Sequence, residues 1–129
     1  MAALYSEIIL DHFRHPRNYG SLPAPDICYE EFNPLCGDRI RIEVKLENQS
    51  VVEEVRFRGD GCAISIAAAS LLTELIVGID VEALEAISDG GLISALESDI
   101  KPSRAQCALL PLEALRAGLR EYKLHESSK

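Results

Sequence analysis

Apolar and charged residues alternate along the middle of the chain, which is the pattern of half-buried strands. The alternation is clearest over 39–47, where Ile40, Ile42, Val44 and Leu46 are apolar and Arg41, Glu43, Lys45 and Glu47 are charged. It predicts a strand with one buried and one solvated face. Further strands are expected over 51–59, after the polar turn 48–50, and over 27–33. Glu53 and Glu54 interrupt the alternation, which a β-bulge would explain.

Apolar residues at helical spacing occupy the start and most of the second half of the chain. They predict helices over 3–14, 63–77, 80–88, 92–97 and 107–121. The segment 63–77 is apolar almost all round and is expected to be buried. Gly90 and Gly91 are expected to break the chain between two helices. Strands followed by helices indicate an α+β fold, in which helices cover one face of a small antiparallel three-stranded sheet.

The composition narrows the classes of function. The 129 residues, expected to form a single domain over 1–129, carry 13 Lys and Arg against 21 Asp and Glu, a net charge of −8. With no run of basic residues, neither nucleic acid nor an anionic membrane is expected as a partner. The longest apolar stretch, 63–78, is interrupted by polar residues, which predicts no membrane-spanning helix. The segment 1–7 lacks a basic leader, so a cytoplasmic, reducing location is expected.

Four cysteines are spread along the chain: Cys28, Cys36, Cys62 and Cys107. In a reducing compartment such residues more often bind metal, take part in catalysis or are simply buried than form disulfides. No Cys-x-x-Cys pair is present, so the common zinc-finger and thioredoxin spacings are absent.

Cys36 and Asp38 share the turn-rich segment Asn-Pro-Leu-Cys-Gly-Asp at 33–38. Gly37 allows backbone angles that other residues avoid, so the loop can present a thiol and a carboxylate together. Two interpretations stay open at this point. The pair binds a metal, or the segment is a tight turn in which Asp38 bonds its neighbouring backbone.

Cys62 and Cys107 are both predicted at helix starts. Cys62 follows Gly-Asp-Gly and opens the apolar helix, where free N–H groups and the helix dipole favour a thiolate, although a buried, well-packed cysteine is the alternative. Pro111 is tolerated in a first helical turn, which predicts that the last helix begins near Cys107. The alternative is a helix that begins upstream, contains Pro111 and buries an inert Cys107.

Cys36, Asp38, Cys62 and Cys107 together form a coherent ligand set for a thiophilic metal. Cys28 lies within a predicted strand and is interpreted as structural. The histidines are not indicated as ligands: His12 and His15 complement the dipole at the end of the first helix, and His125 lies near the C-terminus. A Gly-x-Ser-x-Gly elbow, a phosphate loop and a dinucleotide fingerprint are all absent.

These segments resemble those of the IscU/NifU-type (IscU/SufU-like) iron-sulfur cluster assembly scaffolds. YSEIILDHFRHPRNYG at 5–20 is similar to the opening helix of the family and its Pro-Arg-Asn turn. NPLCGD at 33–38, FRGDGCAIS at 57–65 and RAQCAL at 104–109 resemble the three ligand loops of the family. The likeness extends over nearly the whole chain.

The resemblance implies a non-enzymatic α+β scaffold for [2Fe-2S] cluster assembly. Such a protein accepts persulfide sulfur from a cysteine desulfurase and transfers the cluster to apo-proteins. By this likeness Cys36, Cys62 and Cys107 are cluster ligands and sulfur acceptors, and Asp38 assists ligation and keeps the cluster labile. Zinc is expected at the same residues in the isolated protein.

The branch within the family stays open. Gln106 stands where the IscU branch has a histidine, so the resemblance gives Asp38 the place of the fourth ligand. The segment 100–103 replaces the stretch that a dedicated chaperone recognises in that branch, so that partner is not expected. The opening segment and the Cys107-Ala pair are more similar to the SufU branch, but the 44 residues between Cys62 and Cys107 leave no room for its insertion.

Two alternatives to the scaffold function follow from these features. The SufU-like segments suggest a zinc-bound sulfurtransferase that stimulates a cysteine desulfurase without building a cluster. The acidic composition and small size are the support for a zinc-stabilised structural module.

Overall fold

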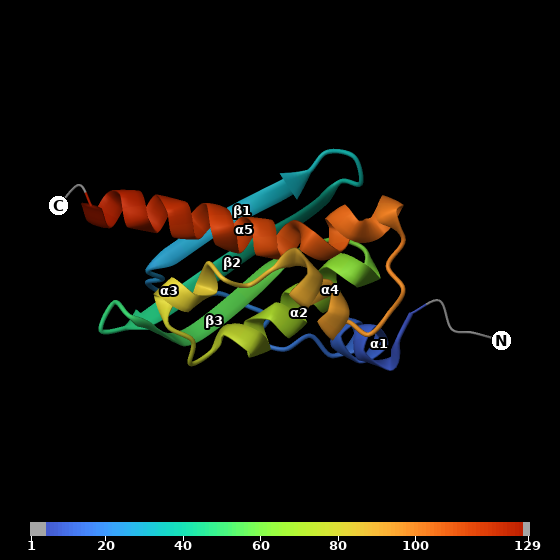
Figure 1. Ribbon diagram of the computed structural model, residues 1–129, viewed down its shortest axis with the longest axis horizontal. Coiled ribbons are helices and arrows are strands. Elements are labelled where there is room, and N and C mark those ends of the chain that lie inside the picture. The colour runs from blue at the N-terminus through green and yellow to red at the C-terminus, as the bar shows by residue number, and fades with distance from the viewer. Residues whose placement is uncertain (1–4, 128–129) are drawn as a thin grey trace.

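The computed structural model describes residues 5–127. The chain forms a three-stranded sheet and helices, which confirms the α+β fold (Figure 1). In chain order the elements are α1 (Glu7–Arg14), β1 (Ile27–Asn33), β2 (Asp38–Glu47), β3 (Val51–Asp60), α2 (Ala63–Ile76), α3 (Val81–Leu84), α4 (Asp89–Ala95) and α5 (Pro102–Ser127). Positions 3 and 4, predicted to be helical, lie outside the described residues.

The sheet is an antiparallel meander in the order β1-β2-β3. Ile42 at its centre pairs with Tyr29 of β1 and with Phe57 of β3. The strand bounds agree with the predicted ones to within one residue. The register shifts at Lys45 and Leu46, which face Glu54 and Val52, so Glu53 is an extra residue in β3 and the predicted bulge is confirmed.

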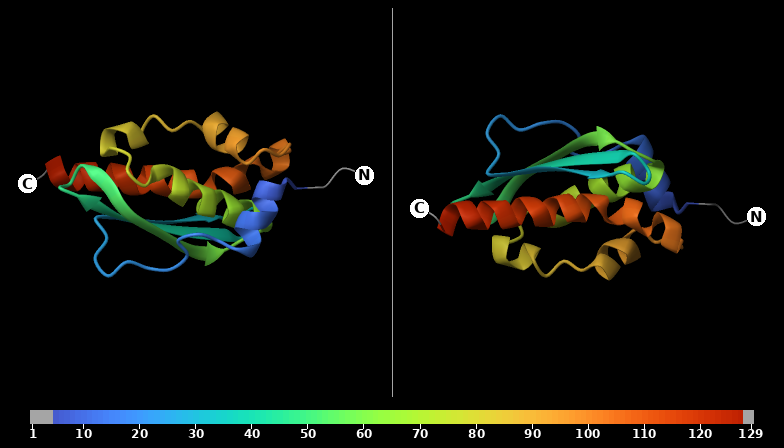
Figure 2. Two further views of the ribbon diagram at one scale, coloured as in Figure 1. Left: turned by 90° about the horizontal axis from the view of Figure 1, so that it is seen from below. Right: turned by 90° about the horizontal axis from the view of Figure 1, so that it is seen from above.

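One face of the sheet is packed against α2 and α5 and forms the main core. Ile40, Ile42 and Val44 of β2 and Phe57 of β3 are fully buried there. Figure 2 shows the long helix α5 running along the sheet, with α2, α3 and α4 on the same side. Burial of large apolar side chains such as these contributes roughly 1.5–3 kcal/mol each, and this packing holds together the strand ends and helix starts that form the site.

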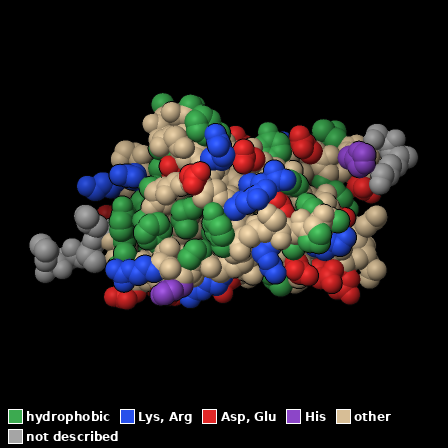
Figure 3. Space-filling view, turned by 180° about the vertical axis from the view of Figure 1, so that it is seen from behind, with side chains coloured by type: hydrophobic (Ala, Val, Ile, Leu, Met, Phe, Trp, Pro, Cys, Tyr) green, Lys and Arg blue, Asp and Glu red, His purple; other side chains and the backbone are tan. Residues whose placement is uncertain are grey.

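The opposite face of the sheet is not a simple solvated face. The connector 20–26 crosses it, on the side away from the helices (Figure 2). Glu43 is only 2% exposed. The Leu22 N–H donates to its Oε1 at 2.7 Å, and Nε of Arg41 donates to its Oε2 at 2.6 Å. The prediction that Glu43 faces water is therefore wrong, because the connector covers it and supplies a donor. On the same side of the molecule, basic and acidic side chains are interspersed (Figure 3).

α5 begins at Pro102, five residues before Cys107, and contains Pro111. The prediction of a helix that starts near Cys107 is wrong, and the upstream start is correct. A proline inside a helix costs about 3 kcal/mol and leaves the carbonyl of Cys107 without its intrahelical donor. Burial of Leu110, Leu112 and Leu115 against the sheet and α2 offsets this cost. Within residues 5–127, no helix combines the length and hydropathy needed to cross a membrane.

The other helices differ from their predicted bounds because of their caps. α1 begins at Glu7, since the Ser6 hydroxyl oxygen accepts the Ile9 N–H at 3.2 Å. α3 is four residues long and shorter than predicted. α4 begins at Asp89, and its N-cap Ser88 accepts the N–H of Gly91 at 3.0 Å. Gly90 and Gly91 therefore lie in a helical turn rather than in a break, because the cap and the buried Leu92 outweigh their low helix propensity.

Candidate metal centre

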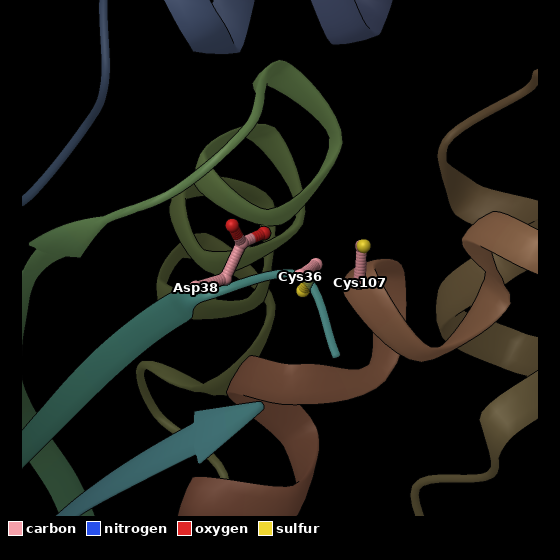
Figure 4. A group of neighbouring side chains, drawn as sticks. All are labelled: Cys36, Asp38 and Cys107. Carbon is pink, nitrogen blue, oxygen red and sulfur yellow. The ribbon is translucent and has the colours of Figure 1, made fainter. Parts of the chain in front are cut away.

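Three potential ligands meet at the end of the sheet where the β1–β2 loop, the start of β2 and the first half of α5 come together. The Sγ atoms of Cys36 and Cys107 and a carboxylate oxygen of Asp38 lie within 4.8 Å of one another. Figure 4 shows the three side chains arriving from the loop, the strand and the helix. Cys36 is exposed, whereas Asp38 and Cys107 are buried. The fold thus joins residues that are far apart in the sequence.

The loop that carries Cys36 is shaped by Asn33. The side-chain Oδ1 of Asn33 accepts the Leu35 N–H at 2.9 Å, and its carbonyl accepts the Gly37 N–H at 2.8 Å. Gly37 has a φ of +75°, in the left-handed region that favours glycine. Asn33, and not Asp38, therefore bonds the turn backbone, which leaves the Asp38 carboxylate for other partners.

Asp38 is bound to the start of α2 through one oxygen. Its Oδ2 accepts the Cys62 N–H at 3.3 Å and the Ser65 hydroxyl at 2.9 Å. Gly61 makes this approach possible, because a Cβ at that position would lie 2.2 Å from Ser65 Oγ and 3.2 Å from Asp38 Oδ2. The strand and the helix are thus joined through a carboxylate.

Cys62 lies beside this group rather than inside it. It is the N-cap of α2, as predicted, and its thiol contacts Ser65 Oγ at 3.8 Å. The pKa of Arg104 lies above its ordinary value because of the neighbouring Cys62 and, to a smaller extent, Tyr5 and Cys107. Arg104 therefore places a positive charge next to Cys62.

Cys107 occupies the second turn of α5 and is 3% exposed. Burial, followed by the hydrogen bond with Cys36 and the nearby Cys62, raises the pKa of its thiol to about 12. The prediction that Cys107 lies at the start of the last helix, among backbone N–H groups without intrahelical partners, is therefore wrong. In the metal-free protein this thiol is protonated at neutral pH, and a bound cation would have to displace the proton.

These donors fit a thiophilic cation. Ligands of a tetrahedral zinc ion lie about 2.0–2.3 Å from the metal, and hence roughly 3.3–3.8 Å from one another. A contraction of at most about 1.0–1.5 Å brings the group from within 4.8 Å to that spacing. Thiolates with one carboxylate suit zinc, and thiolates are also the usual ligands of iron-sulfur clusters. Cys36, Asp38 and Cys107 would hold such an ion, and Cys62 is the nearest further thiol.

Sequence reasoning missed three residues of this site: Ser65, Gly61 and Arg104. Ser65 was interpreted only as a position in an apolar helix. A serine three residues after an N-cap lies close to the N-cap residue, and this spacing could have indicated its contact with Cys62. Gly61 was visible only as the residue before Cys62, whereas the absence of its side chain leaves room for Ser65 and Asp38. No local pattern marks Arg104, because its proximity to Cys62 depends on the packing of α5.

Cys28 and His12 lie outside the group. Cys28 is half-buried in β1 opposite Glu43, as its structural interpretation requires. Nδ1 of His12 lies 2.7 Å from Ser70 Oγ, and the imidazole is buried between α1 and α2. Burial, followed by the charge of Arg17, lowers the pKa of His12, so the imidazole is neutral at pH 7 and does not complement the helix dipole as predicted.

Comparison with known proteins identifies one family. The family model for the NifU-like N-terminal domain matches residues 4–129, and the chain belongs to this family. The zinc-dependent sulfurtransferase SufU of Bacillus subtilis is 39% identical, with 90% of this chain and 89% of that protein covered. The iron-sulfur cluster assembly scaffold protein IscU of Azotobacter vinelandii is 35% identical, with 92% and 94% covered.

Solved structures agree with this assignment. SufU from Fervidobacterium islandicum, described as an iron-sulfur cluster assembly scaffold for the SUF system, superposes with a TM-score of 0.74 at 26% identity. The match covers 90% of this chain and 96% of that one. A NifU-like N-terminal domain from Brucella abortus shares the fold, with a TM-score of 0.76 at 18% identity and coverage of 94% and 95%.

The alignments also bear on the length of the chain. The match to Bacillus SufU extends over 133 positions although it includes 90% of a 129-residue chain, so that protein has additional residues inside the matched region. The match to Azotobacter IscU covers 92% of the chain in 122 positions and is nearly free of gaps. The chain therefore combines higher identity to a SufU with the length of an IscU.

Proposed function

We propose that this protein is a scaffold on which a [2Fe-2S] cluster is assembled as cargo and then passed to apo-proteins. The observation that carries the proposal is the convergence of Cys36, Asp38 and Cys107, with Cys62 beside them, at one end of the sheet. Thiolates are the ligands of such clusters, and one carboxylate among them provides a weaker attachment. A scaffold needs this combination, because it must both hold and release its cargo.

The gradient of exposure supports an order of events for sulfur. Cys36 is exposed, Cys62 is partly buried and Cys107 is buried. A Cys36 thiolate can attack the outer sulfur of a desulfurase cysteine persulfide, forming a persulfide on Cys36 and releasing the desulfurase thiolate. The sulfane sulfur moves without net oxidation or reduction. The buried Cys107 is then suited to ligation more than to first contact.

The surface around Cys36 suits a protein partner. Leu35, within the ligand loop next to Cys36, is 87% exposed, and Phe32, just before the loop, is 48% exposed. Apolar side chains exposed next to a reactive thiol are a typical core of a protein interface. We propose a cysteine desulfurase and apo iron-sulfur acceptors as the partners, and no dedicated chaperone.

A second candidate function is that of a zinc-bound sulfurtransferase that stimulates a desulfurase. It is favoured by the 39% identity to a protein named as a zinc-dependent sulfurtransferase. Zinc would be held by Cys36, Asp38 and Cys107, with Cys62 next to it. Bound zinc would keep the thiols deprotonated at neutral pH. Accessible Cys36 would again receive the sulfur.

The test is a series of single substitutions in anaerobic cluster assembly with ferrous iron, cysteine and a desulfurase. Cys36→Ala, Cys62→Ala and Cys107→Ala are expected to lose the protein-bound charge-transfer absorption. Cys28→Ala is the matched control and is expected to retain it, because Cys28 lies in β1 outside the group. Equal retention by all four variants would contradict the proposal. Stimulated sulfide release without a bound chromophore in the unsubstituted protein would favour the sulfurtransferase.

A further inference from the structure

Ser65 is a buried polar residue whose hydrogen bond is directed at the candidate metal centre. It lies in the first turn of α2 and is 0% exposed. Its Oγ lies 2.9 Å from Asp38 Oδ2 and 3.1 Å from the carbonyl oxygen of Cys62. One hydroxyl proton cannot serve both acceptors, and the shorter contact is to a carboxylate, which is the stronger acceptor.

The hydrogen bonds to Asp38 are distributed unequally over its two oxygens. The Cys62 N–H and the Ser65 hydroxyl both donate to Oδ2. Among residues 5–127 no donor is assigned to Oδ1, which leaves that oxygen available to a cation. The carboxylate is thus held through one oxygen and available through the other, an arrangement suited to monodentate ligation.

Gly61 provides an independent indication that this arrangement is built into the fold. Its φ is not positive, so the backbone conformation does not require glycine. Instead, a Cβ at position 61 would lie 2.2 Å from Ser65 Oγ and 3.2 Å from Asp38 Oδ2. The missing side chain makes room for the hydrogen bond between Ser65 and Asp38.

We infer that Ser65 is a positioning residue, which fixes the Asp38 carboxylate so that one oxygen is presented to the metal. The inference rests on the proposed function, in which Asp38 is a ligand. Carboxylates that bind metals are themselves oriented by hydrogen-bond donors, and loss of such a donor typically weakens metal binding by about 10–100-fold. A purely structural Ser65 would bond its own helix at the Cys62 carbonyl and leave metal affinity unchanged.

The experiment measures zinc affinity by competition with a chromophoric chelator, using the full-length chain. The variants are Ser65→Ala, Asp38→Ala and the double variant, with Ser70→Ala as the matched control. Ser70 is equally buried in α2, but its hydroxyl contacts His12 and the Arg17 N–H, away from the centre. Cobalt spectra of the same variants report directly on the ligand field of the site.

Ser65→Ala is expected to weaken zinc binding about 10–100-fold and to change the cobalt spectrum, while Ser70→Ala leaves both unchanged. Because Ser65 acts through Asp38, Ser65→Ala should add nothing in the Asp38→Ala background. Ser65→Thr, which keeps the hydroxyl, is expected to restore affinity. Gly61→Ala should weaken binding in the same way as Ser65→Ala, and it replaces that variant if Ser65→Ala does not fold.

Wild-type affinity in Ser65→Ala, or an equal loss with and without Asp38, would overturn the role of Ser65. If Asp38→Ala itself binds zinc as tightly as the unsubstituted protein, the assignment of Asp38 as a ligand fails instead. The two failures are therefore distinguishable.

Discussion

The peptide N–H of Cys62 donates to Oδ2 of Asp38 at 3.3 Å, so the first residue of β2 is bonded to the N-cap of α2. This bond places the partly buried Cys62 next to a group whose other thiols differ sharply in exposure. Cys36 is at the surface, and Cys107 is in the core. The solvent exposure of the thiols therefore decreases from Cys36 through Cys62 to Cys107.

This gradient predicts the order in which the thiols react. In the reduced, metal-free protein, iodoacetamide is expected to modify Cys36 first, Cys62 more slowly and Cys107 last. Cys107 is slowest because it is buried and its pKa is raised to about 12, which leaves almost no thiolate at pH 8. Peptide mass spectrometry over a time course measures the three rates. Modification of Cys107 as fast as Cys36 would contradict this description of the site.

Zinc is expected to stabilise the folded protein. Binding to the native state alone adds about 2.7 kcal/mol when free zinc is 100 times its dissociation constant. Thermal unfolding with zinc, and after its removal by a chelator, measures the shift in Tm. Cys107→Ala is expected to lose the shift, and Cys28→Ala to keep it. A shift that survives in Cys107→Ala would place the zinc elsewhere.

The buried Glu43 predicts loss of stability in acid. Burial by itself raises the pKa of this carboxyl, but the hydrogen bonds from Leu22 N–H and Arg41 and the charges of Arg41 and Arg58 outweigh it, and the pKa lies below its ordinary value of 4.5. The folded state thus binds fewer protons than the unfolded state. Stability is complete above the unfolded pKa and falls as the pH drops through the folded value.

Glu43→Gln is expected to flatten this acid-dependent loss in urea unfolding below about pH 4.5. At pH 7 the substitution should cost about 1–3 kcal/mol, since a buried charged acceptor of two hydrogen bonds is lost. Glu47→Gln, at the exposed end of the same strand, is the control and should resemble the unsubstituted protein. An unchanged acid profile in Glu43→Gln would assign the loss to other groups.

His12 adds a separate contribution at higher pH. Its pKa is lowered from 6.5, first by burial and then by Arg17, against the opposing charges of Glu74 and Asp11. The unfolded state therefore binds a proton below about pH 6.5 that the folded state resists, and stability falls as the pH drops. Urea midpoints of the metal-free protein between pH 7.5 and 5 are expected to decline, and less so in His12→Gln. A flat profile in the unsubstituted protein would contradict a buried, neutral His12.

Alanine substitutions at Gly59 and Gly90 are expected to have opposite effects on stability, because only Gly59 lies against the backbone of a paired strand. A Cβ at Gly59 would lie 2.0 Å from the carbonyl oxygen of Arg39 in the paired strand, which cannot move away without disturbing the sheet. Gly59→Ala is expected to destabilise by about 2–4 kcal/mol. Gly90→Ala meets no atom within 4 Å and lies in α4, so it should be neutral or stabilising by up to about 1 kcal/mol. Denaturant unfolding measures both, and equal stabilities would contradict the strand pairing at Gly59.

Local patterns predicted the sheet well because strand alternation and the turn at 48–50 are properties of neighbouring residues. β1 occupies 27–33 as predicted, and the bulge is at Glu53. The start of α5 was mispredicted because Pro111 is a strong local signal, which the burial of the Leu110 and Leu112 side chains overrides. Glu43 was mispredicted because a distant connector, not its own strand, covers it.

The candidate site was predicted in part for the same reason. Glycine-rich turns marked Cys36, Asp38 and Cys62 in the sequence, and the structure brings Cys36 and Asp38 together with Cys107. The residues that orient them were missed because their contacts are between elements. Ser65 acts across the gap from α2 to β2, and Arg104 reaches Cys62 from α5. The position of Ser65 three residues after the N-cap was a local signal for its contact with the cap, whereas the proximity of Arg104 to Cys62 depends on tertiary packing, which no local pattern encodes.

The most direct measurement of the proposed function is anaerobic assembly followed by transfer. The apo-protein is incubated with ferrous iron, cysteine and a cysteine desulfurase, isolated by gel filtration, and mixed with an apo-ferredoxin while visible absorption is recorded. The scaffold function predicts a sulfide-to-iron charge-transfer spectrum that co-elutes with the protein and then appears on the ferredoxin. Faster sulfide release with no chromophore on the protein would contradict the scaffold function.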